Sequence, residues 1–172
     1  MDFSIDRAAR EEEPIVGRLL QLYLHDFSTF ATPGQPYGDV GADGLFDYPI
    51  LESYWMASDR EPLLFRTEGR LAGFALINAV APSGAAVDHA MAEFFILRKY
   101  RRCGLGMRAA REILRARPGV WEIGVAAYNA PAIAFWRSAL GGLDDWAVRE
   151  LSGDGARWRG PIFRLRPVRS KG

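Results

Sequence analysis

A short basic segment near the middle of the chain has the residues best suited to bind an anion. It holds four cations and two glycines, Arg98, Lys99, Arg101, Arg102, Gly104 and Gly106. An apolar run precedes it, and a helical pattern over about 105–117 follows it. A helix N-terminus presents unpaired N–H groups and the positive end of the helix dipole, and glycines let a bulky anion approach the backbone. The segment therefore predicts a site for a phosphorylated ligand such as a pyrophosphate.

A second chemical signal lies between Leu19 and Asp59. This stretch holds six acids and no Lys or Arg: Asp26, Asp39, Asp43, Asp47, Glu52 and Asp59. Eight aromatic residues are interleaved with them. Acidic and aromatic side chains together suit a cationic amine, through Coulomb attraction and cation–π contact. We predict an amine site here, and its candidate residues are Asp26, Tyr37, Tyr48 and Trp55. A solvated acidic loop is the alternative.

Hydrophobic periodicity predicts the elements that position these residues. We expect strands over residues 3–6, 62–66, 71–80, 91–97, 121–127, 146–151 and 161–165, and helices over 11–27, 51–57, 105–117 and 131–140. The strand–helix–strand unit over 91–127 is long enough to be a crossover, so its two strands should be parallel. The last two strands read as a closing hairpin. We predict one α/β domain over residues 1–172, with a mixed, mostly antiparallel central sheet and helices on both faces.

Composition excludes several classes of function. The net charge is +1, so no global field favours nucleic acid, and 49% hydrophobic with 25% charged residues is ordinary for a globular protein. No apolar run approaches the roughly 18 to 20 residues of a membrane span, and the first residues do not read as a signal peptide. One cysteine and two histidines offer neither an internal disulfide nor a zinc motif. We expect a cytoplasmic protein without a metal.

Two motifs in this order of elements resemble the GNAT superfamily of acyl-CoA-dependent N-acyltransferases. The first is Arg/Gln-x-x-Gly-x-Gly/Ala, matched by residues 101–106. The second is Asn-x-x-Ala-x-x-aromatic/Leu-Tyr/Trp, matched by residues 129–136 after the next strand. Each motif alone is weak, but the pair with a strand between them is specific. The resemblance covers residues 3–165.

The resemblance implies a GNAT-type sheet and acetyl transfer from acetyl-CoA to the amine of a small molecule or peptide. The backbone of residues 102–107 would hold the CoA pyrophosphate, and the strand edge at 94–96 would pair with the pantetheine arm. Asn129 would bond the pantetheine, and the following helix would flank it. The implied CoA-binding residues are Phe94, Phe95, Ile96, Arg101, Arg102, Cys103, Gly104, Leu105, Gly106, Met107, Asn129, Phe135 and Trp136. The thioester carbonyl would be held by a backbone N–H near Ile96 or Leu97.

This chain departs from the family at two positions. Many members have a tyrosine acid where this chain has Trp136, and indole has no proton of useful acidity. Members that modify ribosomal proteins have a catalytic Glu where this chain has Gly124. The acid and base therefore stay open. Glu93 and Glu122, on the two strands that should flank the acyl group, are the candidate bases, and a structural role is the alternative for each.

Other interpretations compete with this one. Residues 104–109 also spell the dinucleotide-type pattern Gly-x-Gly-x-x-Ala, but position 126, where an acid should bind the ribose, is alanine. The missing Tyr and Glu would suit a non-catalytic acyl-CoA-binding sensor. A homodimer is compatible with the sequence, which does not decide the point.

Overall fold

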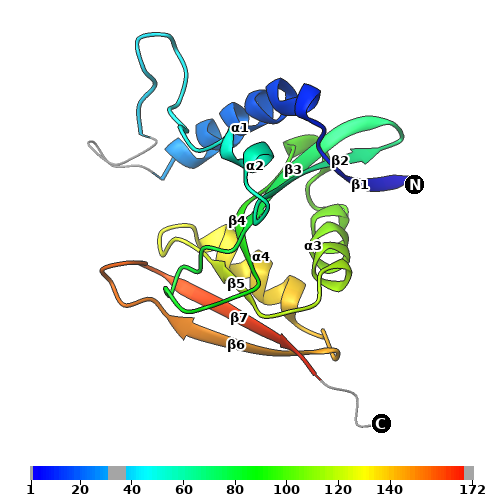
Figure 1. The fold of residues 1–172 in the computed structure, drawn as a ribbon, viewed down its shortest axis with the longest axis vertical. Helices are drawn as coiled ribbons and strands as arrows, with labels where there is room; N and C mark the ends of the chain where they lie inside the picture. The colour runs from blue at the N-terminus through cyan, green and yellow to red at the C-terminus, as the bar shows by residue number, and fades with distance from the viewer. Residues whose placement is uncertain (1, 31–37, 169–172) are drawn as a thin grey trace.

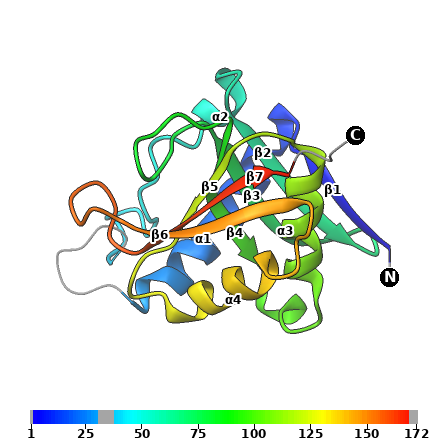
Figure 2. The same ribbon diagram turned by 90° about the horizontal axis from the view of Figure 1, so that it is seen from below.

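The computed structural model describes residues 2–30 and 38–168, which build one twisted sheet with helices packed on it (Figure 1, Figure 2). The strands are β1 (Phe3–Arg7), β2 (Glu61–Thr67), β3 (Arg70–Asn78), β4 (His89–Ile96), β5 (Trp121–Gly124), β6 (Trp146–Ser152) and β7 (Pro161–Pro167). The helices are α1 (Glu13–Ser28), α2 (Ser53–Met56), α3 (Leu105–Ala116) and α4 (Ala130–Leu140), with short 3-10 helices over Arg10–Glu12 and Arg98–Tyr100. The predicted order of elements is confirmed.

The sheet has the strand order β1-β2-β3-β4-β5-β7-β6. All neighbours are antiparallel except β4 and β5, which are parallel. The crossover predicted over 91–127 is therefore confirmed, as is the mixed, mostly antiparallel sheet. The closing hairpin also forms, but its later strand lies inside the sheet: β7 pairs with β5, and β6 becomes the edge. The local sequence pattern of these two strands does not indicate which of them pairs with β5.

Helices cover both faces of the sheet, as predicted, because alternate residues of the strands enter two separate cores. On β2, for example, Phe65 packs with α3 and α4, whereas the adjacent Leu64 packs with α1 and α2. Side chains of a strand alternate between its faces, so this division is what a sheet buried on both sides requires. No described helix combines the length and apolar character that crossing a membrane would need.

Several predicted boundaries move; the short helix expected over 51–57, for example, is α2 over Ser53–Met56. The helix expected over 11–27 begins with the 3-10 turn, and α1 itself starts at Glu13 with a proline in its first turn. The strand expected over 121–127 ends at Gly124. Beyond it, the N–H groups of Val125 and Ala127 donate to carbonyls of Pro161 and Arg159, each at 3.0 Å. This stretch therefore follows the segment leading into β7 and leaves β4, which opens the sheet at the site described next.

Candidate active site

The parallel pair β4–β5 is joined over only two residues, and this opening builds the site. His89 lies opposite Trp121 and Ala90 opposite Glu122, and no register continues beyond them. β4 itself runs on to Ile96, held by β3 alone, while β5 stays with β7. A β-bulge of β4 at Ala92 lies at the start of the unpaired stretch. One edge of β4 is thus left with free backbone groups, beside the strand that no longer pairs with it.

Register decides which N–H groups this free edge presents. The N–H of Leu97 donates to the carbonyl of Ala72 at 2.9 Å, which turns Leu97 toward β3. Backbone groups of a strand alternate between its two edges, so Ile96 and Phe94 direct their N–H groups to the open side. Of the two donors expected to hold a thioester carbonyl, Leu97 is therefore already used within the sheet. Ile96 is available, and Phe94 joins it.

The glycine turn ends at the N-terminus of α3, as predicted, but its two glycines have different roles. Gly104 has φ +81°, and a Cβ there would have no heavy atom within 4 Å. A Cβ on Gly106 would lie 3.2 Å from the ring of Phe135 and 3.4 Å from Ile96. Gly106 therefore lets α3 pack closely onto β4 and α4, whereas Gly104 supplies a left-handed turn beside open space at the helix start.

The four cations of the turn are not all free to meet an anion. Arg98 and Arg101 both bind the carboxylate of Asp26, at the end of α1, with N–O distances of 2.6 Å. Arg101 also donates from Nε to the carbonyl of Ile96 at 2.7 Å. Burial alone would raise the pKa of Asp26, but the two arginines outweigh it and lower that pKa. The residue predicted to attract an amine is therefore neutralised by the cations predicted to attract a phosphate, while Lys99 and Arg102 stay exposed.

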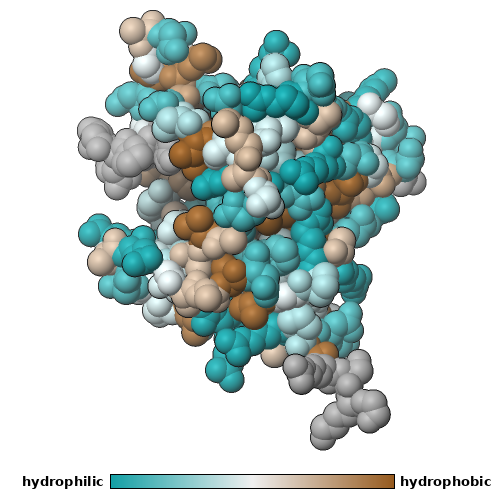
Figure 3. Space-filling view, in the orientation of Figure 1, coloured by the Kyte–Doolittle hydropathy of each residue, from teal (hydrophilic) through white to brown (hydrophobic). Residues whose placement is uncertain are grey.

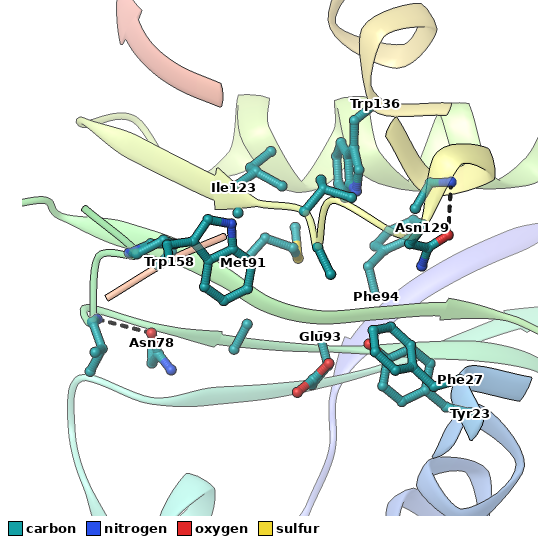
Figure 4. A pocket seen from close by; sticks show the side chains of 18 of the residues that line it. Tyr23, Phe27, Asn78, Met91, Glu93, Phe94, Ile123, Asn129, Trp136 and Trp158 are labelled. Carbon is teal, nitrogen blue, oxygen red and sulfur yellow. Dashed lines mark hydrogen bonds between the residues drawn. The ribbon is translucent and has the colours of Figure 1, made fainter. Parts of the chain in front are cut away.

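Beside the opening lies a cavity of about 560 Å³ that runs between α1, β4, β5 and the β6–β7 loop (Figure 4). Figure 4 shows Glu93 in its middle, with Tyr23 and Phe27 on one side and Trp158 on the other. On the face shown in Figure 3, apolar side chains surface between the part of the molecule that holds α1 and α2 and the part that holds β6 and β7. The wall of the cavity is mostly apolar and aromatic.

Glu93 is the carboxylate that faces this cavity. It lies on β4 next to the bulge, and its Oε1 accepts a hydrogen bond from the hydroxyl of Tyr48 at 3.0 Å. Desolvation raises the pKa of Glu93 from 4.5 to about 7, although hydrogen bonds from Tyr23 and Tyr48 oppose the rise. A carboxylate with a pKa near 7 can hold or release a proton at neutral pH. Tyr48 was predicted for the amine site and does line the cavity.

The other candidate base, Glu122, has different surroundings. It is fully buried and does not line the cavity. Its carboxylate accepts from the hydroxyl and N–H of Ser83, at 2.7 and 3.0 Å, and pairs with Arg164 at 2.5 Å. All of these partners tie β5 to neighbouring segments. This geometry supports the structural alternative for Glu122, because its carboxylate is buried in an ion pair and does not face the cavity.

The aromatic residues expected around the pantetheine divide between the two faces of β4. Phe94 stacks with Phe135 and meets Trp136 edge-on, with ring centroids 5.6 and 5.2 Å apart. Phe94 and Trp136 line the cavity. The side chain of Phe95 lies on the opposite face, in the core beneath α1, with the guanidinium of Arg101 over its ring. Phe95 is therefore a core residue, and its backbone groups, which alternate with those of Phe94 and Ile96, face β3.

Asn129 of the second motif and the remaining residues of the first motif lie at or next to the starts of α4 and α3. Asn129 lines the cavity, and its side-chain oxygen accepts from the N–H of Ala132, which caps α4. Leu105 is buried at the start of α3, and Met107 packs against the same core. Cys103 is exposed, and its thiol donates a hydrogen bond to the carbonyl oxygen of Tyr100 at 3.0 Å. Of these residues, Asn129 alone contacts both the cavity and a helix start.

Two predicted amine-site residues are not confirmed. The indole N–H of Trp55 donates to the carbonyls of Ala8 and Ala9, at 2.9 and 3.0 Å, and the side chain packs in the core under α1. Trp55 therefore fixes α2 to the end of β1 and does not line the cavity. Tyr37 lies outside the described residues. Within the described ranges, no group of three or more His, Cys, Asp and Glu side chains could hold a metal ion.

Sequence reasoning missed Arg157 and Trp158, which reach the cavity from the β6–β7 loop. Asp154 holds this loop: one of its carboxylate oxygens accepts the N–H groups of Ala156, Arg157 and Trp158, at 3.0, 2.7 and 3.2 Å. The Asp154-Gly155 turn predicted the hairpin, but it did not indicate that the loop of this hairpin would lie at the cavity. A Cβ on Gly124 would come within 2.8 Å of the Trp158 ring, so that glycine makes room for the tryptophan.

Comparison with known proteins agrees with this geometry. Residues 18–141 match the family model of the acetyltransferase (GNAT) family, and no curated protein matches the chain significantly. An acetyltransferase from Thermus thermophilus has a similar structure, with 17% identity, 98% of each chain covered and a TM-score of 0.65. A ribosomal-protein-alanine N-acetyltransferase from Brucella melitensis has 18% identity, with 96% of this chain and 99% of that chain covered and a TM-score of 0.58.

A third solved structure is the PaiA N-acetyltransferase from Thermoplasma acidophilum in complex with coenzyme A, with 12% identity, 98% and 100% of the two chains covered and a TM-score of 0.58. At these identities the structural likenesses show the fold. The family model covers well over half of the chain and includes the opened strand pair, the glycine turn and α4. The chain belongs to the GNAT family of acetyltransferases.

Proposed function

We propose that this chain transfers an acetyl group from acetyl-CoA to a primary amine, and that Glu93 takes up the proton which the ammonium must lose. The observation that carries this proposal is the place of Glu93, on the strand whose free edge is expected to receive the thioester arm and with its carboxylate in the cavity beside that edge. A general base works best when its pKa lies near the operating pH, and burial brings the pKa of Glu93 to about 7.

We assign the pantetheine arm and the pyrophosphate of coenzyme A to separate residues of this site. The N–H of Ile96 would pair with a pantetheine amide as an added strand would, which leaves the N–H of Phe94 for the thioester carbonyl. The start of α3 and the left-handed Gly104 would receive the pyrophosphate, with Arg102 exposed close by. Asn129 would contact the pantetheine arm from the side of α4. These residues bind and orient; none of them needs to supply a proton.

The chemistry then balances in three proton movements. Glu93 takes one proton from the ammonium, and the neutral amine forms a C–N bond to the thioester carbon. An N–H of the free β4 edge would hold the carbonyl oxygen as it becomes negative, an interaction of about 3 to 4 kcal/mol in other enzymes. The C–S bond breaks, the thiolate leaves, and the second nitrogen proton ends on sulfur. Glu93 returns its proton to solvent, so that one proton is released per amide formed.

The leaving group needs no acid from Trp136 in this scheme. The side chain is buried, and its indole N–H is not a useful acid. A thiol with a pKa near the cysteine reference of about 8.5 leaves readily as the thiolate. We assign Trp136 to the wall of the arm, packed against Phe94 and Phe135.

The test is a turnover assay with purified protein, acetyl-CoA and a panel of primary amines, read by mass spectrometry of the acetylated amine. Direct detection of product avoids thiol reagents, with which the exposed Cys103 would react. We expect product from at least one amine and its loss in the Glu93→Gln variant. Tight binding of acetyl-CoA without turnover of any amine would refute the proposal and favour the acyl-CoA sensor. A cytoplasmic location stays a prediction.

A further inference from the structure

We propose that the acceptor is a monoamine with an apolar, preferably aromatic, body, and that Arg157 excludes amines with a second positive charge. This inference rests on the proposed function and names the class of amine. It replaces the expectation that a broad acidic surface gathers the acceptor. It follows from which charged and aromatic side chains line the cavity and which do not.

The acids of the segment 19–59 do not line the cavity. Asp26 is bound by two arginines, and Glu52 pairs with Arg10 at 2.8 Å on the surface. Asp43 is exposed and accepts the N–H of Leu45 at 3.1 Å, within its own loop. The undescribed residues 31–37 contain no acid in their sequence. Glu93 is therefore the single carboxylate among the described cavity residues, and one carboxylate matches one ammonium.

The rest of the wall suits an apolar body. Aromatic rings reach the cavity from four separate parts of the chain: Tyr23 and Phe27 from α1, Tyr48 and Tyr54 from the segment before β2, Tyr128 from the β5–α4 turn, and Trp158 from the β6–β7 loop. Phe27 and Tyr128 touch each other edge-on, with centroids 5.9 Å apart, and so join the two walls. Burial of an aryl or alkyl group against these rings would favour binding by roughly 25 cal/mol of free energy per Å² of apolar surface removed from water. A polyamine or an aminoglycoside would have to leave polar groups unpaired there.

Arg157 adds a positive charge to the same wall. Arg157 lines the cavity and Asp154 fixes its backbone; a Cβ on Gly84 would lie only 2.4 Å from the guanidinium, so the side chain lies over that glycine. The side chain is exposed, and its guanidinium is a cation with no acceptor atoms. A second ammonium beside it would be repelled, whereas a neutral or anionic end would be accepted.

The position of Trp158 explains a family difference in the same terms. Relatives that modify ribosomal proteins are expected to have a catalytic Glu at the position of Gly124. Here Pro82 and Trp158 take the space that a side chain would need, at 2.7 and 2.8 Å from an ideal Cβ. An indole therefore lies at this wall, and position 124 has no room for a carboxylate. This makes the site less suited to a cationic partner and more suited to an apolar one.

A matched series of amines tests the proposal. Hexylamine, aminohexanoate and diaminohexane share one chain length and differ only in the far end, which is neutral, negative or positive. We expect kcat/KM for diaminohexane to be about tenfold below that for the other two, and phenylethylamine to exceed hexylamine. In the Arg157→Glu variant the order of aminohexanoate and diaminohexane should reverse.

The control is Arg159→Glu, which makes the same charge change two residues along the loop, at a side chain that does not line the cavity. An equal shift in both variants, or a preference of the wild type for diaminohexane, would overturn the inference while the proposed transfer to amines stands. Acetyl-CoA binding without product from any amine in the series would overturn both. Salt above physiological strength should shrink the Arg157 effect, because exposed charges are screened over roughly 8 Å.

Discussion

Replacing Glu93 with Gln should lower activity and raise stability in the same pH range, which few other substitutions can do. The carboxylate is a base only when ionised, and ionising it inside the cavity is costly. Its pKa is raised from 4.5 to about 7, and that difference corresponds to about 3 kcal/mol. Gln can still accept the hydrogen bond from Tyr48 but carries no charge.

The sign of the stability effect follows from proton binding. Below pH 4.5 the carboxyl is protonated in both the native and the unfolded protein, and Glu93 carries no penalty. Between pH 4.5 and 7 the unfolded chain ionises first, so the native state loses stability as pH rises through this window, and above pH 7 the full penalty is present. Glu93→Gln should therefore be nearly neutral at pH 4.5 and stabilising by about 3 kcal/mol at pH 8, which for a chain of this size is roughly 6 to 12 °C in Tm.

The activity of Glu93→Gln should be lower than that of the wild type, although its stability is higher. General-base catalysis contributes typically about 10² to 10⁴-fold, so kcat/KM should fall by that factor. The wild-type pH–rate profile should rise through a pKa near 7, and the variant should lose this limb. The assays are steady-state acetylation and thermal unfolding of both proteins from pH 4.5 to 8. A variant that keeps the limb near pH 7, or gains the same stability at every pH, would refute the assignment.

Glu122→Gln is the matched control for this prediction, since it makes the same change on the adjacent strand. That carboxylate is buried against Arg164, and removing its charge leaves a buried guanidinium unpaired. Such losses cost about 3 to 5 kcal/mol. The variant should be less stable, and its activity should fall only as the folded fraction falls. Retained stability with lost turnover would make Glu122 the base instead.

Four further results are expected. Gly104→Val should weaken CoA binding and cause a modest loss of stability, because valine is strained at the left-handed φ. Gly106→Val should mainly lower stability, because its side chain would clash with the ring of Phe135. Calorimetry of CoA binding and thermal unfolding measure the two effects. Alkylation of Cys103 should slow at saturating acetyl-CoA, and equal rates would place the pyrophosphate elsewhere. Trp136→Phe should keep much of kcat, while Trp136→Ala should lose about 3 to 5 kcal/mol of stability through a cavity. Asp26→Asn should lower the KM of acetyl-CoA and leave that of the amine nearly unchanged, because it frees the two arginines of the turn for the pyrophosphate; a raised KM of the amine would restore Asp26 to the amine site.

The sequence predicted the elements well because each depends on local periodicity. The helix after the glycine turn, the crossover and the closing hairpin all reflect patterns within about 35 residues. The inversion of β6 and β7 does not, since both strands are equally plausible neighbours of β5. The turn at Gly104 before α3 was also predicted, because a glycine turn before a helix is a local motif.

Long-range pairs account for what the sequence could not give. Asp26 and Arg101 are 75 residues apart, and nothing near either one shows that they meet. Asp26 was predicted to bind an amine and Arg101 a phosphate, each according to its own charge. In the structure the two side chains form an ion pair with each other instead. Glu93 and Glu122 looked alike as acids on adjacent strands. Only the packing around them, a cavity in one case and Ser83 with Arg164 in the other, separates a candidate base from a structural ion pair.

The two departures from the family pattern belong together in this scheme. With Gly124 lined by Pro82 and Trp158, β5 has no room for a carboxylate facing the substrate, so the base must come from the other side of the opening. In the proposed mechanism β4 supplies this base as Glu93, which lies next to the bulge at Ala92 and accepts a hydrogen bond from Tyr48. A base on β4 lies beside the same strand edge that would hold the thioester. The amine is then deprotonated close to the carbon it attacks, and the proton it later gives to sulfur makes an acid at position 136 unnecessary.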